Sequence, residues 1–295
     1  MWGSTEVEVL EHDLDALASR LLRGLAARDW TMPLLSSRFA PSAGTVRIAD
    51  YIDHTLLKAE ATAPQIDRLC EEALEHRFAA VCVNPIWVSR CHERLAGSGV
   101  AVASVVGFPL GASCSTVKAL EAQKAAADGA SELDMVASIG HIKGGNWQAV
   151  HEDIAAVVEA VPGVLVKVII ESAALTPEEV VKACVASRAA GAGYVKTSTG
   201  FHPSGGATVE AVALMRLTVG EELGVKASGG IRDCATAMRM IFHGATRIGT
   251  SSGVAIARCL GETPLPLADL LSFADRHAGD CNSGAFVARG HSRSY

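Results

Sequence analysis

Residues 164–201 read VLVKVIIESAALTPEEVVKACVASRAAGAGYVKTSTGF, which runs from one β-branched apolar segment through a helical pattern to another. Within it, Thr176-Pro177-Glu178-Glu179 is typical of a helix start, and Gly191 is typical of the residue that ends a helix. We therefore expect a β-strand, an α-helix and a second strand, the unit from which parallel sheets are built.

The same alternation of strand and helix patterns continues from Arg47 to about Leu260. Eight such units with nearly continuous apolar strands predict an α/β fold, the TIM (β/α)8 barrel. The first strand is not followed by the G-x-G-x-x-G pattern of dinucleotide-binding folds, which argues against an open doubly wound sheet. The predicted strands are 48–54, 79–84, 101–107, 131–137, 164–171, 192–198, 224–229 and 246–250.

Both ends of the chain differ from this pattern. Leucines at helical spacing predict an amphipathic helix from about Glu6 to Asp29, which we expect to pack on the barrel or on a second subunit. A Pro/Ser/Gly-rich stretch over 31–44 is typical of a linker. The Gly- and Ser-rich C-terminus is typical of a flexible extension. The sequence thus predicts an N-terminal helical extension at 1–45, a catalytic barrel at 46–261 and a C-terminal tail at 262–295.

Composition excludes several classes of function. The 295 residues are 49% hydrophobic and carry a net charge of −6 without a basic stripe, so we expect no nucleic-acid partner. Apolar runs such as 100–110 are shorter than the ~18 residues of a membrane helix, and the N-terminus lacks a signal-peptide pattern, so we expect no membrane partner and a cytoplasmic location. Eight cysteines without a C-x-x-C pair predict mostly buried thiols, and neither a zinc site nor a compact disulfide framework.

Charged residues inside apolar strands are the main functional signal. A charged side chain that faces the barrel interior costs several kcal/mol unless it is paired with an opposite charge or takes part in the function of the site. The active sites of such barrels form where the strands end. Four such residues lie toward the C-terminal halves of consecutive predicted strands: Asp134, Lys167, Lys196 and Lys226. We expect them to form a cluster inside the barrel.

Such a cluster favours Schiff-base chemistry. A second ammonium nearby and burial among apolar residues both favour the neutral form of a lysine, which then attacks a carbonyl. Asp134 is placed to move the protons that imine formation requires. Strand order does not choose among the three lysines, although Lys196 is favoured because it directly precedes Thr-Ser-Thr-Gly at a strand end.

Two further segments predict a phosphate site. Residues 227–232 (ASGGIR) follow the seventh predicted strand, and residues 249–253 (GTSSG) follow the eighth. Glycines let backbone N–H groups approach an anion, helix N-termini favour its charge, and these two loops bind phosphate in many barrels.

The motifs resemble those of the deoxyribose-phosphate aldolases, a family of class I Schiff-base aldolases on the TIM barrel. The resemblance implies reversible cleavage of 2-deoxy-D-ribose 5-phosphate to D-glyceraldehyde 3-phosphate and acetaldehyde in deoxyribonucleotide catabolism, without a metal or an organic cofactor. It covers roughly residues 47–260, through IDHTLLK (52–58), VCVNP (81–85), VVGFPLG (105–111), ELDMV (132–136), KVIIE (167–171), YVKTSTGF (194–201), VKASGGIR (225–232) and RIGTSS (247–252).

The resemblance also implies roles for single residues. Lys196 would form the Schiff base, Asp134 and Lys226 would transfer protons, and Lys226 would favour the neutral amine of Lys196. The substrate pocket would be lined by Asp53, Thr55, Cys82, Lys167 and Thr199. The phosphate would be surrounded by Gly200, Gly229, Gly230, Gly249, Ser251 and Ser252.

Some features depart from the family pattern or stay open. Ser138 stands where asparagine is usual in the family. Phe201 stands where some members carry a phosphate-binding lysine, so in this chain backbone N–H groups would supply more of the phosphate binding. Tyr295 ends the chain as a tyrosine does in some members, where a tail reaches the active site. We expect a homodimer or a larger homo-oligomer. The alternatives are a non-catalytic sugar-phosphate-binding barrel and another sugar-phosphate lyase or isomerase on the same fold.

Overall fold

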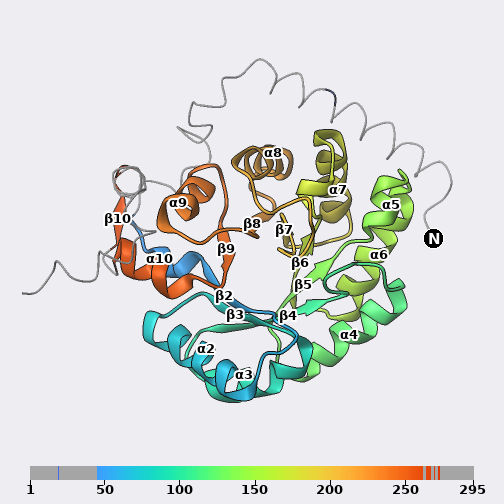
Figure 1. Cartoon of the computed structure of the whole chain (residues 1–295). Helices are drawn as coiled ribbons and strands as arrows, with labels where there is room; N and C mark the ends of the chain where they lie inside the picture. Colours follow the sequence, from blue (N-terminus) through green and yellow to red (C-terminus); the bar gives the residue numbers. More distant parts are fainter. Residues whose placement is uncertain (1–18, 20–44, 262–263, 267–268, 270–271, 273–295) are drawn as a thin grey trace, which may run out of the picture.

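The computed structural model describes residues 19, 45–261, 264–266, 269 and 272. Within these residues, parallel strands β2 to β9 follow each other in chain order and close into a barrel, because β9 pairs with β2 (Figure 1). The predicted (β/α)8 barrel is confirmed. Its strands are β2 (Ile52–Leu56), β3 (Ala80–Val83), β4 (Ala101–Val106), β5 (Glu132–Val136), β6 (Leu165–Ile169), β7 (Tyr194–Lys196), β8 (Gly224–Ser228) and β9 (Arg247–Thr250).

Helices surround the barrel, as the view down its axis shows (Figure 1). Helix α7 begins with the predicted capping box, in which Thr176 and Glu179 bond each other's backbone N–H groups, and it starts with Pro177. The helices are α2 (Ala63–His76), α3 (Val88–Leu95), α4 (Ser115–Ala127), α5 (Ile139–Lys143), α6 (Trp147–Ala160), α7 (Pro177–Ala189), α8 (Val209–Val219), α9 (Cys234–Phe242) and α10 (Gly253–Leu260), with short 3₁₀ helices η1 (Ile48–Tyr51), η2 (Pro85–Trp87) and η3 (Ser172–Ala174).

The start of the first predicted strand is wrong. Residues 48–51 form η1, and the strand covers Ile52–Leu56 instead of 48–54. The local reason is a turn: the carbonyl of Ala49 accepts hydrogen bonds from the N–H groups of Ile52 and Ala79. Ile48 and Ala49 are buried, so the apolar pattern that predicted an extended strand is satisfied by packing of a helical turn.

Parts of the predicted extensions fall outside the described residues. The helix predicted from Glu6 to Asp29, apart from Ser19, and the linker at 31–44 lie outside them, as does Tyr295. Within the region predicted as a tail, β10 (Leu265–Pro266) pairs antiparallel with β1 (Thr45–Val46). This short pairing joins the two ends of the barrel domain and was not predicted from the sequence.

Most of the described cysteines are buried free thiols, and two others form a disulfide. Cys70, Cys82, Cys91 and Cys184 are buried free thiols, as predicted. Cys234 on α9 and Cys259 on α10 form one disulfide, a pair that the sequence analysis did not single out. The two cysteines are 25 residues apart in the sequence, so no short motif predicts that they pair. They meet because the fold places α9 beside α10.

No helix within the described residues is long and apolar enough to cross a membrane.

The barrel core divides into two apolar clusters. A large one contains most of the buried apolar side chains, including outward-facing strand residues such as Val81 and Val225. A small one inside the barrel consists of Leu57, Cys82, Ala103 and Val105, with Phe108 packed against it. Beside this small cluster lies a group of buried charged side chains, which includes Asp53, Asp134, Lys167 and Lys226.

Candidate active site

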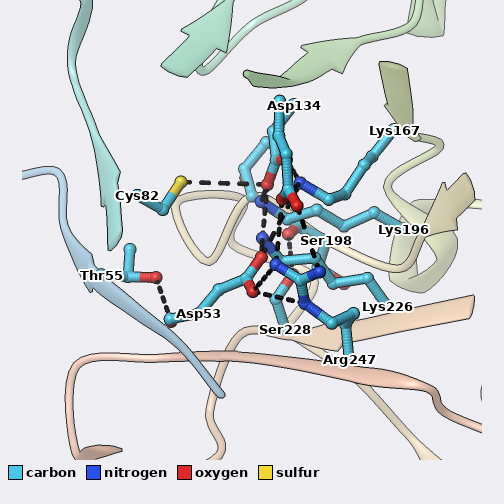
Figure 2. A network of polar contacts seen from close by, with 12 residues as sticks. Asp53, Thr55, Cys82, Asp134, Lys167, Lys196, Ser198, Lys226, Ser228 and Arg247 are labelled. Carbon is cyan, nitrogen blue, oxygen red and sulfur yellow. Dashed lines mark hydrogen bonds and ion pairs between the residues drawn. The ribbon is translucent and has the colours of Figure 1, made fainter. Parts of the chain in front are cut away.

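Asp134 lies at the centre of the charged cluster predicted from the strands (Figure 2). Its Oδ2 is 2.7 Å from Nζ of Lys196 and 2.6 Å from Nζ of Lys226, and its Oδ1 is 2.9 Å from Nζ of Lys167. Lys196 is 3% exposed, whereas the other three side chains have no exposure. The four residues singled out from the sequence are therefore brought together in one buried network.

The strand register explains why these side chains meet. Asp134 on β5 pairs with Lys167 on β6, and Lys196 on β7 pairs with Lys226 on β8. Side chains alternate between the two faces of a strand, so residues at matched levels of neighbouring strands point to the same side. Their apolar neighbours, such as Val195, pack outward against the helices.

The network contains further charges, two of which sequence reasoning missed. Asp53 accepts hydrogen bonds from Lys226 and from Arg247. Arg247 also donates two hydrogen bonds to Glu132, at 3.2 and 2.9 Å, and Nζ of Lys167 is 2.6 Å from Glu132. Arg247 and Glu132 lie at the starts of β9 and β5, so the rule that charged residues in strands are informative also applies to them.

The balance of charge distinguishes Lys196 from the other cations. Within the described residues the network holds three carboxylates, Asp53, Glu132 and Asp134, against three lysines and Arg247. Nζ of Lys167 lies within 4 Å of all three carboxylates, and Nζ of Lys226 within 4 Å of two. Among the carboxylates that the structure describes, Nζ of Lys196 forms an ion pair with Asp134 alone. Of the three lysines, Lys196 is therefore the one that the carboxylates of the network attract least.

The directions of the pKa shifts agree with this pairing. Burial works to raise the pKa of Asp134, but the three lysines around it hold that pKa well below its usual range. Burial works to lower the pKa of Lys226, but Asp134 and Asp53 raise it above the ordinary value of a lysine. Asp134 and Lys226 therefore stay charged at neutral pH.

The buried carboxyl of Asp53 makes folding sensitive to acid. Burial works to raise its pKa, but Lys226 and the other cations around it lower it to about 2. Because an unfolded aspartate titrates near ~3.9, this carboxylate stabilises the fold above that pH, and the stabilisation is lost as the pH falls through about 2. We expect the free energy of unfolding to lose roughly 2–3 kcal/mol from this group between about pH 5 and pH 2. Urea unfolding curves across this range measure it, and a constant stability would contradict the pairing.

A pocket of about 250 Å³ opens above the network. Of the three lysines, Lys196 is the one among the pocket's lining residues. Thr55 also lines the pocket, with its hydroxyl donating to the carbonyl of Asp53 at 2.8 Å. A carbonyl compound in the pocket therefore meets the amine of Lys196 before it meets any other lysine of the network.

The predicted phosphate residues gather at one side of this pocket, with one exception. The pocket is lined by Gly200, Gly229, Gly230 and Ser251, which come from the loops after β7, β8 and β9, and by Gly249 in β9 itself. Ser252 is not among the lining residues; it is the N-cap of α10, and its N–H donates to Oγ1 of Thr250 at 2.9 Å. A side chain at position 249 would crowd the site, because a Cβ there would lie 2.9 Å from Cβ of Ser228 and 3.0 Å from Cε of Lys226.

Cys82 and Thr199 occupy different parts of the site. Sγ of Cys82 is 3.9 Å from Oδ2 of Asp134, and burial together with Asp134 raises the pKa of this thiol. The thiol therefore stays protonated and forms part of the apolar wall beside the network. Thr199 lines the pocket and is held from behind by Glu171, a buried carboxylate that the sequence analysis did not select.

The described residues contain no group of three His, Cys, Asp or Glu side chains arranged to hold a metal ion. The carboxylates of the barrel interior are each bonded to lysine or arginine. The chemistry that the site itself offers is that of a buried amine, a carboxylate that bridges two amines, and a glycine-rich rim.

Comparisons with known proteins agree with this geometry. A deoxyribose-phosphate aldolase from Brevibacillus brevis is 60% identical over 206 residues, which make up 70% of this chain and 93% of that protein. One from Mannheimia succiniciproducens is 55% identical over 213 residues, 72% of this chain and 95% of that protein. The structure of the deoxyribose phosphate aldolase from Aeropyrum pernix has a TM-score of 0.66 and 34% identity, covering 72% of this chain and 89% of that one. The model of the DeoC/LacD family aldolases matches residues 47–259, and the chain belongs to this family.

Proposed function

We propose that this chain is a deoxyribose-phosphate aldolase, which reversibly cleaves 2-deoxy-D-ribose 5-phosphate to D-glyceraldehyde 3-phosphate and acetaldehyde. The relatives of that name, at 55–61% identity, support the substrate. One observation carries the proposal: the amine of Lys196 lies at the wall of a pocket, on a carboxylate oxygen that it shares with Lys226. A buried amine with a proton carrier in contact is what Schiff-base formation requires.

Lys196 is proposed as the nucleophile for two reasons. It lines the pocket, and among the cations of the network described above it has the fewest carboxylate partners. The charge of Lys226 on the same oxygen disfavours a second ammonium beside it, so the neutral amine of Lys196 becomes accessible. Lys167, which lies between three carboxylates, is proposed to keep Asp134 ionised and in place.

The reaction then follows from the positions of these groups. The neutral amine of Lys196 adds to C1 of the open-chain sugar, and loss of water from the carbinolamine gives an iminium ion. The C3 hydroxyl loses its proton, the C2–C3 bond breaks, and glyceraldehyde 3-phosphate leaves while the electron pair moves into an enamine. Protonation of the enamine at C2 and addition of water release acetaldehyde and the free amine. Asp134 and Lys226 are proposed to move these protons, because both contact the reacting amine or its carboxylate partner.

The phosphate is proposed to bind at the glycine-rich rim. Backbone N–H groups at Gly229, Gly230 and Gly249 and the start of α10 offer partial positive charge there. Phe201 lines the same side of the pocket and brings no charge, so the backbone groups carry most of this interaction.

A coupled assay tests the proposed function. We expect the purified chain to release glyceraldehyde 3-phosphate from 2-deoxy-D-ribose 5-phosphate, and to keep its full rate in excess chelator because amine chemistry needs no metal. The matched measurement uses the same enzyme without chelator. No product from this substrate, or a rate that chelator removes and added divalent metal restores, would contradict the proposal.

We propose further that the chain assembles as a homodimer or a larger homo-oligomer. The aldolase from Aeropyrum pernix is tetrameric, which supports association of barrels of this family.

A further inference from the structure

Glu171 is a buried charged residue that the mechanism above does not use. It follows β6, and its side chain is 1% exposed. Both of its oxygens accept from the N–H of Thr199, at 3.3 and 3.2 Å, and Oε2 also accepts from the Thr199 hydroxyl at 2.6 Å. A buried carboxylate is costly unless it is bonded in this way, so its partners indicate what it does.

The backbone of Glu171 is also unusual. Its φ of 56° and ψ of 54° place it in the left-handed region, which residues other than glycine rarely adopt. The neighbours on either side are bonded to the end of β7 and to the residue after it: Ile170 N–H donates to the carbonyl of Lys196 at 3.0 Å, and Ser172 N–H to that of Thr197 at 2.8 Å. An unfavourable conformation persists only where the surroundings determine it, and it is a pointer to function.

The contact continues from Thr199 to the rim of the pocket. Oγ1 of Thr199 accepts from the N–H of Phe201 at 3.1 Å while its proton is donated to Glu171. Thr199, Gly200 and Phe201 all line the pocket, whereas Glu171 does not. The carboxylate therefore holds Thr199 directly and the N–H of Phe201 only through the Thr199 hydroxyl, without a place in the pocket itself.

We infer that Glu171 is a positioning residue for the phosphate site, which acts by holding the Thr199–Phe201 turn so that its backbone faces the substrate's phosphate. The inference rests on the proposed function and adds a residue to it. A carboxylate suits this position because it only accepts: the turn offers an N–H and a hydroxyl proton, both of which need acceptors.

The test is Glu171→Gln, which keeps the shape of the side chain but replaces one acceptor oxygen by an NH₂ donor. We expect a KM for 2-deoxy-D-ribose 5-phosphate about tenfold higher, with kcat within about twofold, because one charged hydrogen bond is lost behind the phosphate site. The kcat/KM for unphosphorylated 2-deoxy-D-ribose is expected to stay within about twofold. Inorganic phosphate, titrated by calorimetry, is expected to bind about tenfold more weakly.

Two more variants separate the carboxylate from the backbone. Glu171→Gly permits the left-handed conformation but removes the side chain, and we expect it to raise the KM at least as much as Glu171→Gln does. Glu179→Gln is the matched control. Glu179 also accepts from a backbone N–H, that of Thr176, but it caps α7 away from the pocket. We expect this control to keep wild-type kinetics.

The outcomes are distinct. Unchanged KM and phosphate affinity in Glu171→Gln would overturn the inference, as would equal losses of kcat/KM with both sugars, which indicate general damage to the site. Wild-type kinetics in Glu171→Gly would show that the backbone conformation suffices and would also overturn it. A wild-type enzyme that binds phosphate but cleaves neither sugar would refute the proposed function, while the phosphate titration of Glu171→Gln would still decide the role of Glu171.

Discussion

Lys196→Met is expected to lower kcat for 2-deoxy-D-ribose 5-phosphate by at least about 10⁴-fold. Methionine has a similar length but no amine, so the covalent route is lost entirely. The fold is expected to survive, because Asp134 keeps two of its lysine partners, Lys167 and Lys226. Steady-state kinetics in the coupled assay measure the loss.

The control for this variant is Lys124→Met, at an exposed position on α4. We expect it to keep wild-type turnover, and both variants to unfold cooperatively in urea. If Lys196→Met retained more than a few per cent of wild-type turnover, another group would be the nucleophile.

Asp134→Asn is expected to lower kcat by about 10²–10⁴-fold, the usual contribution of a general acid or base. The amide cannot take up a proton, and it leaves Lys196 without a carboxylate among the residues the structure describes. Imine formation then depends on proton exchange with water alone. We expect KM to change less than kcat, because Asp134 is not among the lining residues of the pocket. Steady-state kinetics separate the two constants.

Asp153→Asn provides a matched control for the damage done by removing a buried carboxylate. Asp153 on α6 accepts from the buried Lys118 at 2.6 Å, outside the barrel interior, and Lys118 also donates to the carbonyl of Val136. This variant is expected to lower the free energy of unfolding by roughly 3–5 kcal/mol with little effect on kcat. Equal losses of kcat in Asp153→Asn and Asp134→Asn would mean that Asp134 has only a structural role.

The barrel could be predicted because its signals are local and repeated. The run from Val164 to Phe201 already contains a strand, a capped helix and a second strand, and seven of the eight predicted strands overlap their observed counterparts closely. The exception at residues 48–51 is a short apolar run, in which a buried helical turn and a buried strand have the same hydrophobic pattern.

The part of the candidate site that could be predicted is the part built from charged residues inside apolar strands, because such residues are rare. Asp134 and the three lysines were found in this way, and the structure brings them together. Strand order alone left the choice among the three lysines open, and only the position before Thr-Ser-Thr-Gly and the family resemblance favoured Lys196. The physical grounds for the choice are which amine lines the pocket and how many carboxylates each amine contacts. Those are properties of the closed barrel, not of any one segment.

Glu171 and the disulfide escaped prediction for related reasons. Glu171 follows an apolar strand in a loop, where a carboxylate is ordinarily exposed, and only its left-handed backbone and its bonds to Thr199 reveal its role. Cys234 and Cys259 lie on different helices and meet only after the chain has closed. Ser252 is not among the lining residues of the pocket, but it stands at the N-cap position of α10, so its place in the phosphate site stays a prediction.

Borohydride reduction of the enzyme in the presence of acetaldehyde, followed by peptide mass mapping, tests the central claim most directly. Reduction of the imine fixes an ethyl group on the nitrogen that formed it. We predict that the wild-type chain carries this group on Lys196 and that Lys196→Met carries none in the barrel. An ethyl group on Lys167 or Lys226, or no modification of the active wild-type enzyme, would contradict the account.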